Sequence, residues 1–191
     1  MYQATPVLKA VAVSFLLSLP PLAFAHGDGG HGKPRAVDYS KAEETPFGRA
    51  GDPKKASRTI TIGMNDRMQF VTANGNRAAD VRAGAAPHAM PGDLVLRRGE
   101  TVRFVVHNDG QLMHEMVIGS MKELKEHAEM MRKFPDMEHD EAYMAHVAPG
   151  KTETIVWQFG KVGEFHYACL IPGHLEAGMI AKITVEPRRK P

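Results

Sequence analysis

The sequence contains a single cysteine, Cys169, in 191 residues. One cysteine excludes an internal disulfide, so the fold must be stable without a covalent cross-link. A lone thiol is also a liability in an oxidising compartment. Cys169 is therefore a buried inert side chain, a metal ligand or a nucleophile, and composition alone does not decide among the three.

The chain also lacks a strong excess of either charge. Its 24 basic and 22 acidic residues leave a formal net charge of +2. A nucleic-acid partner would need a concentrated basic surface, so the composition argues against one. The basic tail at 188–191 is interpreted as a solvated terminus.

Long hydrophobic runs are missing as well. The apolar run Ala10–Leu19 is shorter than the roughly 20 residues that span a bilayer. It follows Lys9 and precedes Ala23-Phe24-Ala25, which has the pattern of a signal-peptidase site. We expect residues 1–25 to be a signal peptide cleaved after Ala25, giving an exported, periplasmic chain with no membrane attachment. The alternative is an N-terminal membrane anchor, which the short run disfavours.

Beyond the signal, composition divides the chain into an arm and a domain. Residues 26–57 are dominated by Gly, Pro, His and charge without apolar periodicity, which predicts a flexible His/Gly-rich arm. From residue 58 onward short β-rich runs alternate with turn signals. These runs are 58–64, two within 93–109 joined by a hairpin-like "RRGE" turn, 114–119, 151–159, 163–169 and 178–186. The pattern predicts an all-β protein, with a Greek-key β-sandwich over residues 58–187.

One short helix is expected between the strands, at "SMKELKEHAEMMRKF" (120–134). Ser120 and Glu123 have the spacing of a capping box. Pro135 would end the helix. One apolar stripe is formed by Met121, Leu124, Ala128 and Met131.

The stretch "CLIPGHLEAGM" sets a thiol, an imidazole and a thioether at Cys169, His174 and Met179. Soft sulfur and imidazole ligands select copper over hard cations, and two His with one Cys and a weak axial Met form a blue-copper centre. His114, where a strand follows an Asn-Asp-Gly loop, is the candidate for the second imidazole. Zinc is a weaker alternative because its sites seldom use a thioether. A Cys–His nucleophile would lack an orienting Asn or Asp and leave Met179 unexplained.

The segment "GEFHYACLIPGHLEAGMIAKITV", with the upstream strand, loop and histidine, resembles the cupredoxin family. The resemblance covers roughly residues 58–187. It implies one type 1 copper site with the ligands His114, Cys169, His174 and Met179. In many cupredoxins an Asn or Asp follows the first histidine and helps to fix the ligand loops, whereas this chain has Glu115. With all four ligands supplied by protein, no position is open to substrate, so we do not expect an enzyme.

Additional Met and His residues could form weaker copper sites, because thioethers and imidazoles bind Cu(I) and Cu(II). Cleavage after Ala25 would leave His26 with a free amine beside its ring. The alternatives are a plain Gly-rich spacer at the N-terminus and ordinary core packing for the methionines. The candidate secondary residues are His26, His31, Met137, His139, Met144 and His146.

Residues 112–150 also resemble the periplasmic cupredoxins associated with bacterial copper tolerance, the CopI-like group. That resemblance implies copper sequestration or handling, with copper ions and a periplasmic redox or copper-transport protein as partners. The alternative is a soluble electron-transfer blue copper protein. A carrier would present an apolar patch, for which Leu170, Ile171 and Leu175 are the candidates.

Overall fold

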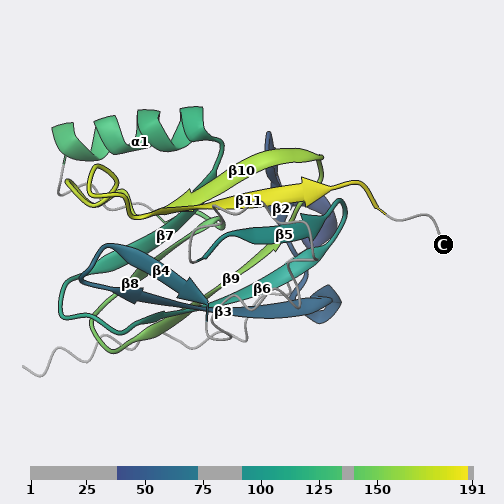
Figure 1. The fold of residues 1–191 in the computed structure, drawn as a ribbon. Coiled ribbons are helices and arrows are strands. Elements are labelled where there is room, and N and C mark those ends of the chain that lie inside the picture. Colours follow the sequence, from purple (N-terminus) through teal and green to yellow (C-terminus); the bar gives the residue numbers. More distant parts are fainter. Residues whose placement is uncertain (1–37, 73–91, 135–139, 189–191) are drawn as a thin grey trace, which may run out of the picture. The chain divides into compact units, whose positions relative to one another are not determined.

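The computed structural model describes residues 38–72, 92–134 and 140–188, which all belong to one compact unit. Two β-sheets face each other, and helix α1 (Met121–Lys133) lies outside the sheet that contains β7 and β10 (Figure 1). This arrangement confirms the predicted all-β sandwich with one inserted helix.

Within the described ranges the first sheet has six strands in the order β1-β2-β9-β6-β3-β4. Its neighbours are antiparallel except for β3 and β6, which run parallel. In sheet order the strands are β1 (Glu44–Thr45), β2 (Gly48–Ala50), β9 (Thr152–Gln158), β6 (Thr101–Asn108), β3 (Arg58–Asn65) and β4 (Gln69–Thr72).

The second sheet has five strands over the same described ranges, in the order β5-β11-β10-β7-β8. Only the β11–β5 pair in it is parallel. Its strands are β5 (Leu94–Arg97), β11 (Ile180–Glu186), β10 (Gly163–Ala168), β7 (His114–Gly119) and β8 (Met144–Val147).

The core forms where the inward faces of the sheets meet. Burial alternates along most strands, as in β6 and β11, because successive side chains point to opposite faces. Strand β7 is buried at all six positions. One of its faces packs in the sandwich through Met116 and Ile118, and the other packs through Val117 against the apolar stripe of α1. The strand that begins at His114 is thus covered on both sides.

Helix α1 matches the sequence expectation. The Ser120 hydroxyl accepts from the Glu123 N–H, and the Glu123 carboxylate accepts from the Ser120 N–H, which completes the capping box. Leu124, Ala128 and Met131 are buried. No helix among the described residues has both the length and the apolar character that crossing a membrane requires.

The hairpin expected across "RRGE" is wrong. Strands β5 and β6 lie in different sheets, β5 beside β11 and β6 between β9 and β3. Strands β5 and β6 are each apolar on one face. The turn between them takes the chain from one sheet to the other, so the apolar face of each strand points into the core. Alternation shows which side chains are buried but does not identify the neighbouring strand.

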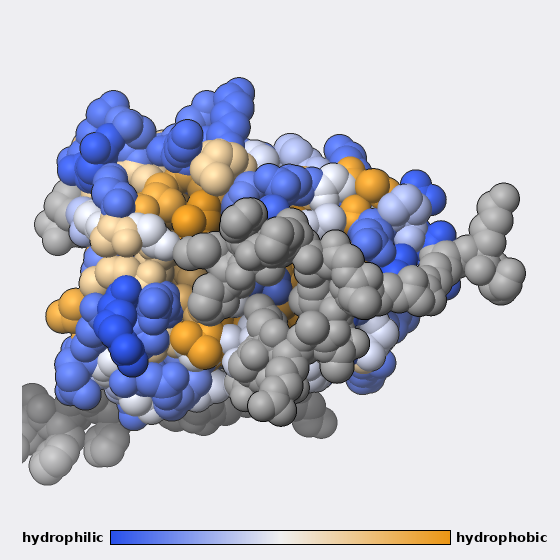
Figure 2. Space-filling model, viewed as in Figure 1, coloured by the Kyte–Doolittle hydropathy of each residue, from blue (hydrophilic) through white to orange (hydrophobic). Residues whose placement is uncertain are grey.

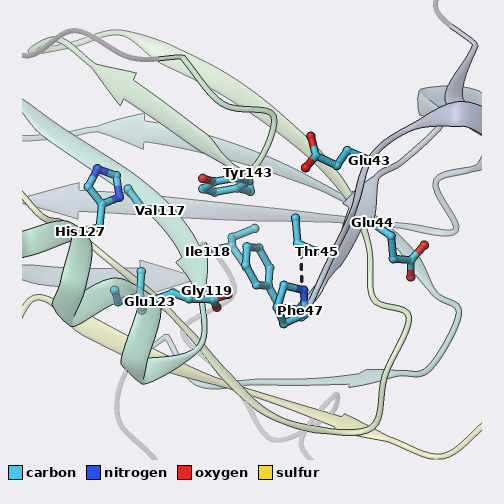
Figure 3. Close-up of a pocket in the computed structure, with 12 residues that line it drawn as sticks. Glu43, Glu44, Thr45, Phe47, Val117, Ile118, Gly119, Glu123, His127 and Tyr143 are labelled. Atoms are coloured by element: carbon cyan, nitrogen blue, oxygen red, sulfur yellow. Dashed lines mark hydrogen bonds between the residues drawn. The ribbon is translucent and has the colours of Figure 1, made fainter.

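The prediction of a flexible arm over residues 26–57 fails for its second half. Strand β2 pairs with β9, and Phe47 is only 4% exposed. The Phe47 ring stacks on Trp157 at 5.4 Å and meets Tyr143 edge-on at 5.3 Å. Figure 3 shows Phe47 next to Ile118 and Tyr143, beside a pocket that the first half of α1 also lines. One buried aromatic, without any periodic pattern, ties this segment to the core.

The predicted signal peptide, the first part of the arm and the end of the basic tail cannot be compared with the structure. Residues 1–25, residues 26–37 and the end of the basic tail at 189–191 lie outside the described residues.

Replacing Phe47 with Ala tests whether this segment belongs to the domain. We expect F47A to lower the free energy of unfolding by about 3 kcal/mol or more, because it removes a buried aromatic side chain. Urea unfolding followed by Trp157 fluorescence measures the loss. The matched control is F134A, since Phe134 is 59% exposed and its loss should cost about 0.5 kcal/mol or less. Equal losses in the two variants would show that the segment adds nothing to the core.

Candidate metal centre

The site is formed where β7 begins and β10 ends. These two strands pair antiparallel, with Ala168 opposite Val117. His114 is the first residue of β7, and Cys169 directly follows β10. The pairing therefore brings together a histidine and a cysteine that are 55 residues apart in the sequence; the Glu115 N–H, one residue further on, lies 3.4 Å from the Cys169 sulfur.

The loop from Cys169 to Met179 is held by its own backbone hydrogen bonds. The Cys169 N–H donates to the Met179 carbonyl at 3.1 Å, and the Met179 N–H donates to the His174 carbonyl at 3.0 Å. Gly173 and Gly178 have φ values of 90° and 93°, in the left-handed region that glycine adopts without strain. The loop thus brings Met179 back beside Cys169 and fixes His174 between them.

Three of the four predicted ligands converge. Ligand atoms of His114, Cys169 and His174 all lie within 4.8 Å of one another. The Cys169 sulfur is 3.2 Å from His174 Nδ1, and the centroids of the two imidazole rings are 5.0 Å apart. His114 and Cys169 are fully buried, while His174 is partly exposed. These distances suit a small ion bound between two imidazoles and a thiolate.

The hydrogen bonding of His114 supports a metal at this position. Its Nε2 lies 3.1 Å from Asp66 Oδ1, and its buried Nδ1 has no hydrogen-bond partner among the described residues. Buried polar atoms are nearly always paired, so an unpaired one calls for an explanation. A proton on Nε2 leaves a lone pair on Nδ1, and a bound ion would satisfy it.

Met179 is fully buried, and its backbone is bonded to both Cys169 and His174. It remains the predicted fourth ligand. Its place at the end of the loop sets its backbone beside those of Cys169 and His174.

The electrostatics favour the neutral forms of Cys169 and His174 in the metal-free protein. Burial raises the pKa of the Cys169 thiol to about 12, although the Glu115 N–H opposes the shift. Burial also lowers the pKa of His174, and the neighbouring His114 lowers it further. At neutral pH the thiol is therefore protonated, which protects it from oxidation, and the His174 imidazole is neutral and free to bind a metal.

Glu115 replaces the Asn or Asp expected after the first histidine, and it is completely buried. Its Oε1 accepts from the Leu170 N–H at 2.7 Å. Its Oε2 lies 3.1 Å from His146 Nδ1, an ion-pair distance without the angle of a hydrogen bond. A single side chain thus joins β7 to the ligand loop and to β8. The longer side chain of Glu reaches both neighbours.

Of the six predicted secondary copper residues, the structure describes Met144 and His146. Met144 is 5% exposed and packs with Leu124 and Val117 beneath α1, which favours core packing over loose copper binding for this side chain. The sequence analysis predicted no strand at residues 144–147, whereas β8 pairs with β7. His146 lies next to Glu115. The other four residues, His26, His31, Met137 and His139, lie outside the described residues.

The apolar surface near the site differs in part from the expectation. Leu170 is buried, whereas Ile171 and Leu175 are partly exposed. Leu112 and Met113, just before His114, are 48% and 47% exposed, and sequence analysis did not select them. Figure 2 shows apolar side chains gathered at the end of the sandwich below α1, where the ligand loop lies.

A β-sandwich with one cysteine and two histidines converging at one end defines a cupredoxin with a single type 1 copper site. Residues 56–186 match the family of copper binding proteins described as plastocyanin/azurin, and the chain belongs to this family.

Among individual proteins, the chain is similar to two named copper-resistant cuproprotein CopI. It is 41% identical to that of Rubrivivax gelatinosus over 182 residues, which cover 94% of this chain and 95% of the relative. It is 43% identical to that of Vibrio cholerae over 179 residues, or 92% and 96% of the two chains. The reduced auracyanin of Roseiflexus castenholzii shares the fold, with a TM-score of 0.51 and 18% identity over 69% of this chain and 99% of that one. These matches confirm the predicted cupredoxin sandwich and the resemblance to the CopI-like group.

The role of Glu115 can be tested by its effect on stability. We expect E115A to lower the free energy of unfolding by about 1–3 kcal/mol, because the buried Leu170 N–H loses its acceptor. E115Q keeps an acceptor oxygen and should cost less than E115A. Chemical denaturation of the metal-free protein measures both. The matched control is E164A, which removes an exposed carboxylate that is also paired with a histidine. If E115A cost no more than E164A, Glu115 would not hold the loop.

Proposed function

We propose that this protein is a periplasmic copper-binding cupredoxin that sequesters or hands on copper in copper tolerance. The observation that carries the proposal is its similarity to copper-resistant cuproproteins over more than 90% of the chain, combined with a site of soft ligands. The signal-like residues 1–25 support export to the periplasm, with no membrane attachment after cleavage.

His114, Cys169, His174 and Met179 would hold the copper. Thiolate, thioether and imidazole ligands accommodate both Cu(I) and Cu(II), so the bound metal could also exchange one electron. His114 and Cys169 are buried and the loop is fixed by its backbone, so the protein presents the ligands in place. With four protein ligands no coordination position remains for a substrate, and we infer that the protein is not an enzyme.

A second function, soluble electron transfer, is favoured by one specific observation. Leu112 and Met113 expose apolar surface directly before His114, and Ile171 and Leu175 expose part of theirs within the ligand loop. An apolar surface beside a redox metal suits brief contact with a redox partner. We propose that a periplasmic redox or copper-transport protein binds here, in addition to the role in tolerance.

The copper site is tested by loading the protein with copper and recording its visible spectrum. We expect wild-type protein to bind one equivalent at this site with an intense thiolate-to-copper band, and C169S to lose the band because the thiolate is gone. The matched control is H107A, since His107 is an exposed histidine bonded to Thr152 and Asp109 outside the site. A wild-type spectrum without the band would contradict the type 1 assignment.

Growth in copper separates tolerance from electron transfer. In a strain without this protein, the highest copper concentration that permits growth should fall. The gene for wild type or H107A should restore growth at higher copper concentrations, and the gene for C169S should not. Unchanged copper sensitivity of the deletion strain, with the visible band intact in the purified protein, would leave electron transfer as the function.

A further inference from the structure

Asp66 lies in the turn between β3 and β4, and its carboxylate reaches the copper end of the sandwich. Oδ1 is 3.1 Å from His114 Nε2. The same carboxylate accepts from the backbone N–H groups of Gln111 at 2.8 Å and Leu112 at 3.2 Å. It therefore bonds both to the ring of a predicted ligand and to the loop that leads into that ligand.

The structure of the turn and the loop keeps this carboxylate in place. The Asn65 side chain accepts from the Arg67 N–H at 3.0 Å, which shapes the turn. A Cβ on Gly110 would overlap the Asp66 carboxylate, so glycine permits the close approach. The Gln111 and Leu112 N–H groups donate to its two oxygens. Asp66 is thus a carboxylate acceptor that its neighbours hold in one position.

The contact with Asp66 determines which nitrogen of His114 is available. A neutral imidazole carries one proton, and an acceptor at Nε2 places it there. Nδ1, which is buried and has no partner among the described residues, then keeps its lone pair for a metal. A carboxylate behind a ligating histidine also makes the imidazole a stronger donor.

We propose that Asp66 is a positioning residue for the copper site: its carboxylate holds His114 as the Nε2–H tautomer with Nδ1 toward the metal, and its negative charge favours Cu(II) over Cu(I). This inference rests on the proposed copper site and names the residue that tunes it. Backbone bonds and packing orient Cys169 and His174, whereas the contact with His114 comes from an ionised side chain in a turn 48 residues away.

Three variants separate the charge of Asp66 from its hydrogen bond. D66A removes both. D66N removes the charge, but its amide oxygen can still accept from His114 Nε2 and the Leu112 N–H, so the ligand stays positioned. D109N is the matched control, because Asp109 is a nearby carboxylate in the same loop region that pairs with His107 instead of a ligand.

The copper-loaded proteins are compared by Cu(I) and Cu(II) competition titrations and by reduction potential. We expect D66A to lose about 10- to 100-fold in copper affinity, the usual effect of removing the partner of a ligating histidine. For D66N we expect about tenfold weaker Cu(II) binding with Cu(I) binding unchanged, which raises the one-electron potential by about 59 mV. D109N should match wild type in all three quantities.

The metal-free proteins provide a readout that does not depend on copper. Nitrogen-15 NMR of the histidine rings should show His114 with its proton on Nε2 in wild type and D66N. In D66A the fixed tautomer should be lost. A wild-type protein that binds no copper at this site would refute the proposed function, and the NMR result would still decide whether Asp66 orients the ring.

Two results would overturn the inference. If D66N and D109N raised the potential equally, the effect would be general surface charge and not a contact with the ligand. If D66A kept both the wild-type affinities and the wild-type tautomer, Asp66 would have no positioning role. D66N retains most of the loop contacts and keeps the test valid if D66A does not fold.

Discussion

The antiparallel pairing of β7 with β10 is the contact on which the metal centre depends. It sets His114 near Cys169, and the loop that follows β10 brings His174 and Met179 to the same place. Because β7 is buried between the opposite sheet and α1, the pairing cannot shift without exposing one apolar face or the other. The packing of the sandwich and the geometry of the site therefore have the same cause.

Two carboxylates add further contacts that hold the predicted ligands in place. Glu115 joins β7 to the backbone of the ligand loop, and Asp66 bonds the ring of His114 from the far side. Both are acidic side chains that directly contact a predicted ligand or the ligand loop. Since a copper ion adds positive charge, these carboxylates would stabilise the loaded protein more than the metal-free protein. Only one of them is buried, so salt should screen Asp66 more than Glu115.

Local patterns predicted much of this molecule. Alternation located most of the strands, the Ser120–Glu123 spacing located the helix start, and the spacing of Cys169, His174 and Met179 pointed to the ligand loop. What failed depended on partners distant in the sequence. Phe47 joins the core through Trp157, 110 residues away, and nothing near Phe47 indicates this. Met144 lies where no strand was predicted, and its burial follows from the pairing of β8 with β7. Asp66 gave no signal, because a single Asp in a turn has no recognisable pattern until the turn is placed beside His114.

The central claim, that one copper ion is held between β7 and the ligand loop, is tested most directly by anomalous diffraction from copper-loaded crystals at the copper absorption edge. We predict one strong peak among His114 Nδ1, the Cys169 sulfur and His174 Nδ1, with the Met179 sulfur as the fourth ligand. A strong peak elsewhere on the protein, with none among these atoms, would contradict it.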